Sequence, residues 1–431
     1  MDTQISHPRR LTTSKPAPRR WLILAFLMAL CFISHFNRAS IASAGDERIM
    51  KQFGIPPDQM GVIYSAFLIV YTLFMIPGGW LIDRRGPRFA LACAGLGSAL
   101  FCGLTGGIGF GIFAAGQVWF ALLIVRSLMG LLSAPLHPAS ARAAGNWFPP
   151  QQQSIANGLI TGASVLAYAV VHRVFGSLID RFDWPIAFVI TASATALLAL
   201  AWMVFGADRP AELDQGPLNE PSLESIQTAS DSGDWKGNSR RNLVLLTLSY
   251  AAVGYFQYLF FYWLHYYFDS VLHMDKADSR DFAGLPNLAM AACMPLGGWL
   301  TDRIVRWRGH RAGNSMVPKF GMTLSALFLV GGIFATDHHW IVGCFTASLG
   351  ALGLCEASFW TAAINLGRQR GGTSAAIMNT GGNGIGLLAP MITPWLGTHL
   401  GWQWGIGAGA IIGLLGALCW FGISSDEDSA A

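Results

Sequence analysis

Long apolar segments recur along nearly the whole chain, separated by short polar stretches. A helix needs about 20 apolar residues to cross a lipid bilayer. Runs of about this length lie at 21–44, 59–82, 89–109, 113–138, 152–178, 185–206, 242–267, 281–301, 316–336, 339–363, 373–396 and 402–423. Six of them precede a stretch rich in Pro, Gly, Ser, Asp and Glu, and six follow it. The pattern predicts an all-α membrane protein with twelve transmembrane helices in two six-helix halves.

The basic residues give this arrangement an orientation. If the N-terminus is cytoplasmic, 20 of the 28 Lys and Arg residues fall in cytoplasmic segments and 5 in outer loops. An excess of Lys and Arg marks the cytoplasmic side of a membrane protein. We therefore expect both termini inside, with a tail at 1–20, a first half at 21–206, a linker at 207–241, a second half at 242–423 and a tail at 424–431.

The composition excludes several other classes of protein. Hydrophobic residues make up 53% of the chain and charged residues only 12%, which is too few charges for a soluble protein of this size. No basic run is interleaved with aromatic residues, so nucleic acid is not an expected partner. The seven cysteines lie inside apolar stretches without metal-ligand spacing. We expect no cofactor, no metal site and no catalytic set, and therefore not an enzyme.

A short motif occurs once in each predicted half. The segment Ile76-Pro77-Gly78-Gly79-Trp80-Leu81-Ile82-Asp83-Arg84 recurs as Pro295-Leu296-Gly297-Gly298-Trp299-Leu300-Thr301-Asp302-Arg303, and each copy closes the second span of its half. Gly79 and Gly298 are 219 residues apart, and so are Asp83 and Asp302. Parallel repeats of this kind are one known architecture of membrane transporters. The repeat predicts two similar halves, each with a tight turn after its second helix.

The motif resembles the loop between the second and third helices of the major facilitator superfamily. The matching segment runs from Gly79 to Arg88, and Pro87 stands where the family usually has a basic residue. The resemblance implies a gate latch on the inner face. Its expected members are Gly79, Asp83, Arg84, Gly86 and Arg88, with Asp302 and Arg303 in the second half.

A narrower resemblance is to the anion:cation symporter branch, which includes bacterial hexonate and hexuronate permeases. It is carried by Asn37-Arg38-Ala39-Ser40, by Ser65-Ala66-Phe67 with Tyr71, by Arg126 seven residues before Ser133, by Trp147-Phe148-Pro149 and by Asn379-Thr380-Gly381-Gly382-Asn383. The resemblance implies a monomeric carrier of a small organic anion, such as a sugar acid, in the bacterial inner membrane. It also implies alternating access and coupling to a cation, with a proton favoured over sodium.

Two arginines interrupt the apolar spans of the first half. Placing an arginine near the bilayer centre costs at least about 2.5–3.5 kcal/mol of insertion free energy. Arg38 and Arg126 are therefore expected to be buried in protein and to have a function. A guanidinium can bind a carboxylate through two parallel hydrogen bonds. We therefore expect these arginines to hold the anion; an internal salt bridge is the alternative. Further expected substrate contacts, whose alternative is helix–helix hydrogen bonding, are Tyr71, Gln257, Tyr258, Asn379 and Asn383.

The coupling residues depart from the branch pattern. Proton-coupled members usually have an aspartate and a glutamate where this chain has Asn37 and Ser133, and neither side chain titrates near neutral pH. Glu356 in the tenth span and the histidines His35 and His137 are the remaining proton-binding candidates. Each could instead be structural, and Glu356 could pair with a cavity arginine. An uncoupled facilitator, an anion exchanger, a sodium-coupled carrier and a non-transporting sensor therefore stay open.

The fifth span carries an adjacent pair of ionisable residues, His172 and Arg173. The pair could face the cavity and touch substrate, or it could extend toward the membrane interface. The sequence leaves these two interpretations open.

Overall fold

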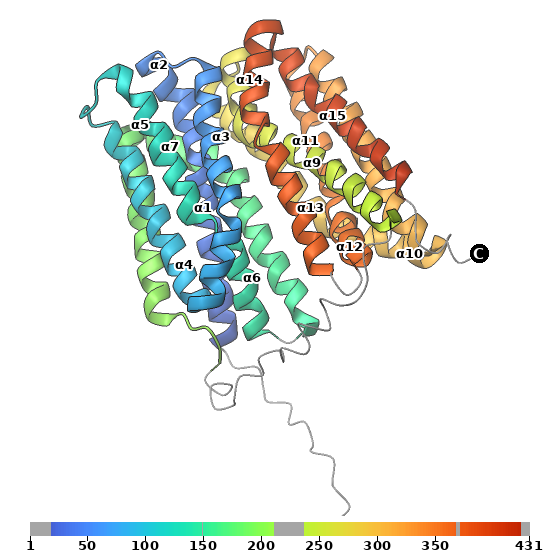
Figure 1. The fold of residues 1–431 in the computed structure, drawn as a ribbon. Coiled ribbons are helices and arrows are strands. Elements are labelled where there is room, and N and C mark those ends of the chain that lie inside the picture. The colour runs from blue at the N-terminus through green and yellow to red at the C-terminus, as the bar shows by residue number, and fades with distance from the viewer. Residues whose placement is uncertain (1–18, 149, 211–236, 368–370, 424–431) are drawn as a thin grey trace, which may run out of the picture.

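The computed structural model describes residues 19–148, 150–210, 237–367 and 371–423, and over these residues the chain is helical without strands. The helices form two groups, the first from the N-terminal part of the chain and the second from the C-terminal part (Figure 1). Most of the stretch 207–241 that we expected to be a linker lies outside the described residues, as do the two expected tails apart from Arg19 and Arg20.

The first group has eight helical elements. They are α1 (Arg19–Ala44), the short π-helix η1 (Gly45–Ile49), α2 (Met50–Phe53), α3 (Pro57–Leu73), α4 (Met75–Ile108), α5 (Ala115–Ser133), α6 (Leu136–Trp147) and α7 (Pro150–Phe205). Two of these elements change direction internally, α4 at Gly86 (φ 82°) and α7 at Asp183 (φ 65°). Positive φ values of this kind break a right-handed helix, so α7 holds both the fifth and the sixth expected spans.

The second group repeats this arrangement with different breaks. Its elements are α9 (Gly237–Tyr266), the short π-helix η3 (Tyr267–Val271), α10 (Lys276–Phe334), α11 (His338–Gly353), α12 (Glu356–Gly367), α13 (Gly371–Gly386), α14 (Ala389–Leu400) and α15 (Trp402–Gly422). The long helix α10 covers the eighth and ninth expected spans. The tenth span is α11 with α12, and the eleventh is α13 with α14.

The prediction of twelve transmembrane helices agrees with these elements. Among the described residues, eight helices are individually long and apolar enough to cross a membrane, or nine when α3 and the start of α4, bent by 46°, count as one span. The other three expected spans are the second part of α7, the first part of α10 and the pair α13–α14. Large apolar side chains such as Leu197 (69% exposed) and Leu418 (61% exposed) face outward, as lipid-facing residues do.

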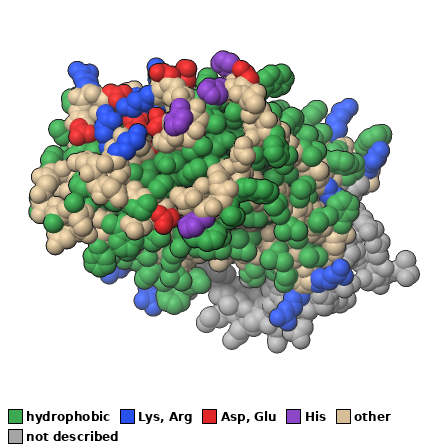
Figure 2. Space-filling model, turned by 90° about the horizontal axis from the view of Figure 1, so that it is seen from above, with side chains coloured by type: hydrophobic (Ala, Val, Ile, Leu, Met, Phe, Trp, Pro, Cys, Tyr) green, Lys and Arg blue, Asp and Glu red, His purple; other side chains and the backbone are tan. Residues whose placement is uncertain are grey.

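The two groups meet most closely at one end of the bundle. We call this the far end; it carries η1, α2 and the start of α10, and it lies at the top of Figure 1. The opposite end, where α1 begins and α7 ends, is called the linker end. Figure 2 shows the far end from above, where charged and histidine side chains gather on an otherwise largely hydrophobic molecule.

The internal repeat is visible in the helix packing. A Cβ atom on Gly78 would lie 3.3 Å from the backbone of Pro135, at the break between α5 and α6. In the second half, a Cβ on Gly297 would lie 2.0 Å from the carbonyl oxygen of Leu354, at the break between α11 and α12. Both pairs of equivalent residues are 219 positions apart, the same interval as in the motif. Each half therefore packs its second helix against the break in its fourth.

Candidate substrate site and gate

Arg38 projects from α1 into an aromatic enclosure built by both halves. Its guanidinium carbon lies 5.0 Å from the ring centre of Phe67, 5.6 Å from that of Tyr71 and 5.2 Å from that of Tyr258. Its Nε donates a hydrogen bond to the hydroxyl of Tyr262 at 3.3 Å. Its Nη2 is buried and has no hydrogen-bond partner among the described residues. Buried polar atoms are nearly always paired, so this nitrogen is free to bind a ligand.

Arg126 lies beneath Arg38 and binds the backbone of α1. Its Nη2 donates to the carbonyl oxygen of Arg38 at 2.7 Å, and its Nη1 donates to that of Asn37 at 3.3 Å. Its Nε is buried without a partner among the described residues. Neither Arg38 nor Arg126 forms an ion pair with another described residue. The internal salt bridge that the sequence left as an alternative is therefore absent among the described residues. Arg126 fixes the backbone that carries Arg38 and adds positive charge beside it.

Polar groups of the second half reach the same enclosure. The hydroxyl of Tyr258 on α9 donates to Oδ1 of Asn383 on α13 at 2.6 Å, and Asn383 in turn donates to the carbonyl oxygen of Asn379 at 3.0 Å. A Cβ on Gly254 would lie 2.2 Å from the carbonyl oxygen of Gly382, so only glycine permits this approach of α9 and α13. Among the predicted contacts, Gln257 has a partner on another helix, because its amide nitrogen donates to the sulfur of Met290 on α10 at 3.9 Å.

Glu356 occupies the first residue of α12, just after the break in the tenth span. Its Oε1 accepts hydrogen bonds from the hydroxyl of Tyr250 at 2.7 Å and from Nε1 of Trp360 at 3.0 Å. Its Oε2 is buried without a partner among the described residues. Tyr250 and Trp360 are both neutral, so within the described chain Glu356 is not the charged partner of a cavity arginine. Glu356 and His137 are 219 residues apart and hold equivalent places in the repeat.

His35 and His137 form a pair inside the first half. Their Nε2 atoms lie 3.2 Å apart, and Nδ1 of His35 lies 2.8 Å from the carbonyl oxygen of Cys31. A ring nitrogen facing a carbonyl must carry the hydrogen, so the second nitrogen of His35 accepts from His137 when both rings are neutral. Asn37 instead points to Thr195 on α7, with its amide donating at 2.7 Å. Ser133 is buried at the end of α5.

The expected latch motif makes its described contacts with the end of the first half and the start of the linker. The backbone nitrogen of Arg88 donates to Oδ1 of Asp208 at 2.8 Å, and its guanidinium donates to the carbonyl oxygen of Met203. Gly86 supplies the positive φ of the turn. Arg84 and Arg303 are exposed. The side chains of Asp83 and Asp302 lie outside the described part of the structure.

The adjacent residues His172 and Arg173 have different environments. Nδ1 of His172 lies 2.8 Å from the hydroxyl of Ser43, and its ring stacks on that of His265 with 4.6 Å between centres. Arg173 is exposed and pairs with Asp281 at 3.1 Å. His172 therefore lies between the halves, whereas Arg173 lies at the surface of the far end.

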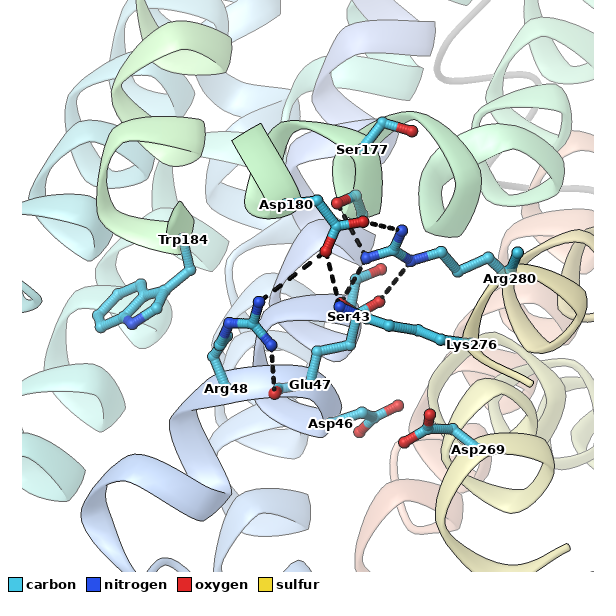
Figure 3. Close-up of polar contacts among 12 residues, drawn as sticks. Ser43, Asp46, Glu47, Arg48, Ser177, Asp180, Trp184, Asp269, Lys276 and Arg280 are labelled. Carbon is cyan, nitrogen blue, oxygen red and sulfur yellow. Dashed lines mark hydrogen bonds and ion pairs between the residues drawn. The ribbon is translucent and has the colours of Figure 1, made fainter. Parts of the chain in front are cut away.

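A cluster of ion pairs at the far end was not recognised from the sequence (Figure 3). Arg280 on α10 donates to both carboxylate oxygens of Glu47 in η1, at 2.8 and 2.7 Å, and also binds Asp180 on α7. Lys276 bridges the same two acids at 3.1 and 2.7 Å. His265 on α9 lies 3.2 Å from Asp46. The only sequence signal was that Lys276 and Arg280 were among the five basic residues that we assigned to outer loops.

This chain is similar to known proteins over most of its length. Residues 27–387 match the family model described as the Major Facilitator Superfamily. The chain is 27% identical to the probable galactarate/D-glucarate transporter of Bacillus subtilis, over 93% of this chain and 91% of that one. It is 24% identical to the D-galactonate transporter of Escherichia coli O6:H1, over 96% and 98%.

Among solved structures, the fold matches that of a bacterial homologue of the human lysosomal transporter Spinster in an inward-facing, unoccupied conformation. The TM-score is 0.74 at 15% identity, over 94% of this chain and 97% of that one. This match concerns the fold alone. The family match covers most of the chain and bears out the resemblance seen in the sequence, including the prediction of a transporter rather than an enzyme. The chain belongs to the Major Facilitator Superfamily.

Proposed function

We propose that this chain carries a small organic anion of the sugar-acid class across the bacterial inner membrane, with both termini in the cytoplasm. The observation that carries the proposal is Arg38, a buried cation with an unpartnered nitrogen and no acid beside it in the described chain. A carboxylate is the ligand that complements a guanidinium best. The relatives named for galactarate, D-glucarate and D-galactonate support the same class of substrate.

In this proposal the substrate carboxylate binds Arg38, and Arg126 holds the α1 backbone in place. The hydroxyls of Tyr71 and Tyr258 and the amides of Asn379 and Asn383 bind the substrate hydroxyls. The rings around Arg38 restrict water and strengthen the charge pair. Because these residues come from both halves, rocking of the halves exposes the site to one side and then the other.

Coupling to a proton is the favoured form of this transport. Asn37 is bonded to Thr195 and cannot titrate. The His35–His137 pair can hold a shared proton, and Glu356 has one unpartnered oxygen. Gln257 stays a proposed contact from the sequence only.

The test is uptake of labelled sugar acids into proteoliposomes under a proton gradient, a sodium gradient or neither. We expect accumulation of at least one aldonate, aldarate or uronate that is driven by the proton gradient. The Arg38→Gln variant should lose uptake, whereas Arg173→Gln, which removes one exposed positive charge, should retain it. Equal uptake by Arg38→Gln and the unmodified protein contradicts the proposal.

The gradients separate the remaining forms of the function. Equilibrative uptake that ignores both ions indicates a facilitator, and uptake that requires an anion on the opposite side indicates an exchanger. Binding without any movement of the labelled acid indicates a sensor.

A further inference from the structure

The imidazole of His265 lies between two buried carboxylates of the other half. Its Nδ1 is 3.2 Å from Oδ2 of Asp46, and its Nε2 is 3.6 Å from Oε1 of Glu47. All three side chains are at most 1% exposed. His265 lies on α9 and the acids in η1, so this contact joins the two halves at the far end.

The fully buried members of the cluster do not balance in charge while His265 is neutral. Glu47 is paired with Arg280, which is itself only 6% exposed. Asp46 has no cation beside it other than His265 in the described chain, and its Oδ1 has no hydrogen-bond partner there. Two carboxylates therefore face one guanidinium. A proton on His265 supplies the missing positive charge, which matters because an unpaired buried charge is costly.

The hydrogen bonding leads to the same conclusion. A neutral imidazole carries one N–H and can donate to only one of the two acids. With that hydrogen toward Asp46, Nε2 presents a lone pair to Glu47, and this nitrogen has no hydrogen-bond partner among the described residues. The protonated ring carries two N–H groups and can donate to both carboxylates. The position of His265 thus fits the imidazolium form.

Other titratable groups surround the site. His172 stacks on His265, so a proton on one ring opposes a proton on the other. Asp269 in η3, Tyr64 on α3 and Tyr266 on α9 also face Asp46. On the outer side, Lys276 lies near Glu47, and Lys51 pairs with Asp269 at 3.9 Å. None of these groups replaces the second N–H that protonated His265 supplies between Asp46 and Glu47.

We propose that His265, with Asp46 and Glu47, is a proton-binding site that holds the far end closed when it is occupied. A proton from solvent on the far side adds to the free imidazole nitrogen when the halves are apart there. The imidazolium then draws η1 and α9 together. Loss of the proton leaves Asp46 uncompensated and favours separation. This site is distinct from the His35–His137 pair and from Glu356.

The experiment measures the width of the far end as a function of pH in the full-length protein, in lipid nanodiscs without substrate. Spin labels are attached at Ile112→Cys and Trp340→Cys, two exposed far-end positions in different halves, after Cys93, Cys293, Cys344 and Cys419 are replaced by alanine. We expect the short-distance population to grow as the pH falls from about 8 to about 5, the range in which histidine titrates.

The variants identify the group responsible. His265→Gln should abolish the pH dependence, and Asp46→Asn should weaken it because the imidazolium loses its partner. Arg173→Gln removes a different ion pair between the halves, the one between α7 and α10, and should leave the pH dependence unchanged. A pH-independent distance in the unmodified protein overturns the proposal, and so does an unchanged response in His265→Gln.

Transport assays show whether the site contributes to coupling, the part of this inference that rests on the proposed function. His265→Gln should retain exchange of labelled sugar acid between equal concentrations while losing accumulation driven by a proton gradient. Accumulation equal to that of the unmodified protein overturns this role. If the unmodified protein moves no sugar acid, the proposed function fails, and the distance measurement still decides the proton site by itself.

Discussion

Buried charges occur in two regions of this molecule; in one region they lack ion-pair partners, and in the other they are paired. At the centre, Arg38 and Arg126 are surrounded by aromatic rings and carbonyl oxygens, with no ion-paired acid among the described residues. At the far end, Arg280 is paired with acids of the other half. A charge left without its counter-ion indicates a site for a ligand that brings one. Charges paired across the two halves fit the closure that we propose for the far end.

The largest expected effect is a loss of stability caused by a substitution at the far end. Arg280→Gln removes the buried guanidinium from Glu47 and leaves the partly exposed Lys276 and the His265 imidazole beside it. Breaking a buried ion pair in this way costs about 3–5 kcal/mol. We expect a marked fall in the thermal unfolding midpoint of the detergent-purified protein. The double variant Glu47→Gln/Arg280→Gln should recover much of the loss, because both charges are then gone. A single variant as stable as the unmodified protein would show that this pairing contributes little.

A substitution in the central site should change the affinity for the anion rather than the stability of the protein. Arg38→Lys keeps the charge and removes the planar fork that can bind a carboxylate through two hydrogen bonds. A hydrogen bond to a charged group contributes about 1.5–3 kcal/mol, so affinity for the anion should fall by about 10- to 150-fold. Isothermal titration with a transported sugar acid measures this change.

The unfolding midpoint of Arg38→Lys should stay close to that of the unmodified protein, because no described acid depends on Arg38. Unchanged affinity would remove Arg38 from the binding site.

The contrast between the two regions also explains what could be predicted from the sequence. The twelve spans and the repeat follow from apolar run lengths and a conspicuous motif. Arg38 was recognised because an arginine inside an apolar span is costly. The ion pairs at the far end were not recognised, because Glu47 and Arg280 lie at span ends, where charges are common. Their partnership joins residues 233 positions apart, which no local pattern shows. The binding of Arg126 to α1 carbonyls depends on packing in the same way.

A smaller effect is expected where the second half closes the central site. Tyr258→Phe keeps the ring that lies 5.2 Å from Arg38 and removes the hydroxyl that donates to Asn383. A neutral hydrogen bond contributes about 1 kcal/mol, so affinity for the substrate should fall about fivefold. Tyr258→Leu should cost more, because the aromatic face against the guanidinium is lost as well. Equal losses in the two variants would assign the whole effect to the hydroxyl.

The smallest expected effect on stability comes from an exposed ion pair, which can be compared with the buried pairs of Arg280. Arg173 and Asp281 join the same two helices as Asp180 and Arg280, yet their side chains are 57% and 51% exposed. Exposed ion pairs contribute about 0–1 kcal/mol and weaken as salt is added. Arg173→Gln should therefore lower the unfolding midpoint slightly at low salt and not at all at high salt. A fall in the unfolding midpoint as large as that of Arg280→Gln would mean that connection between the halves, rather than burial of the charges, determines how much an ion pair stabilises the far end.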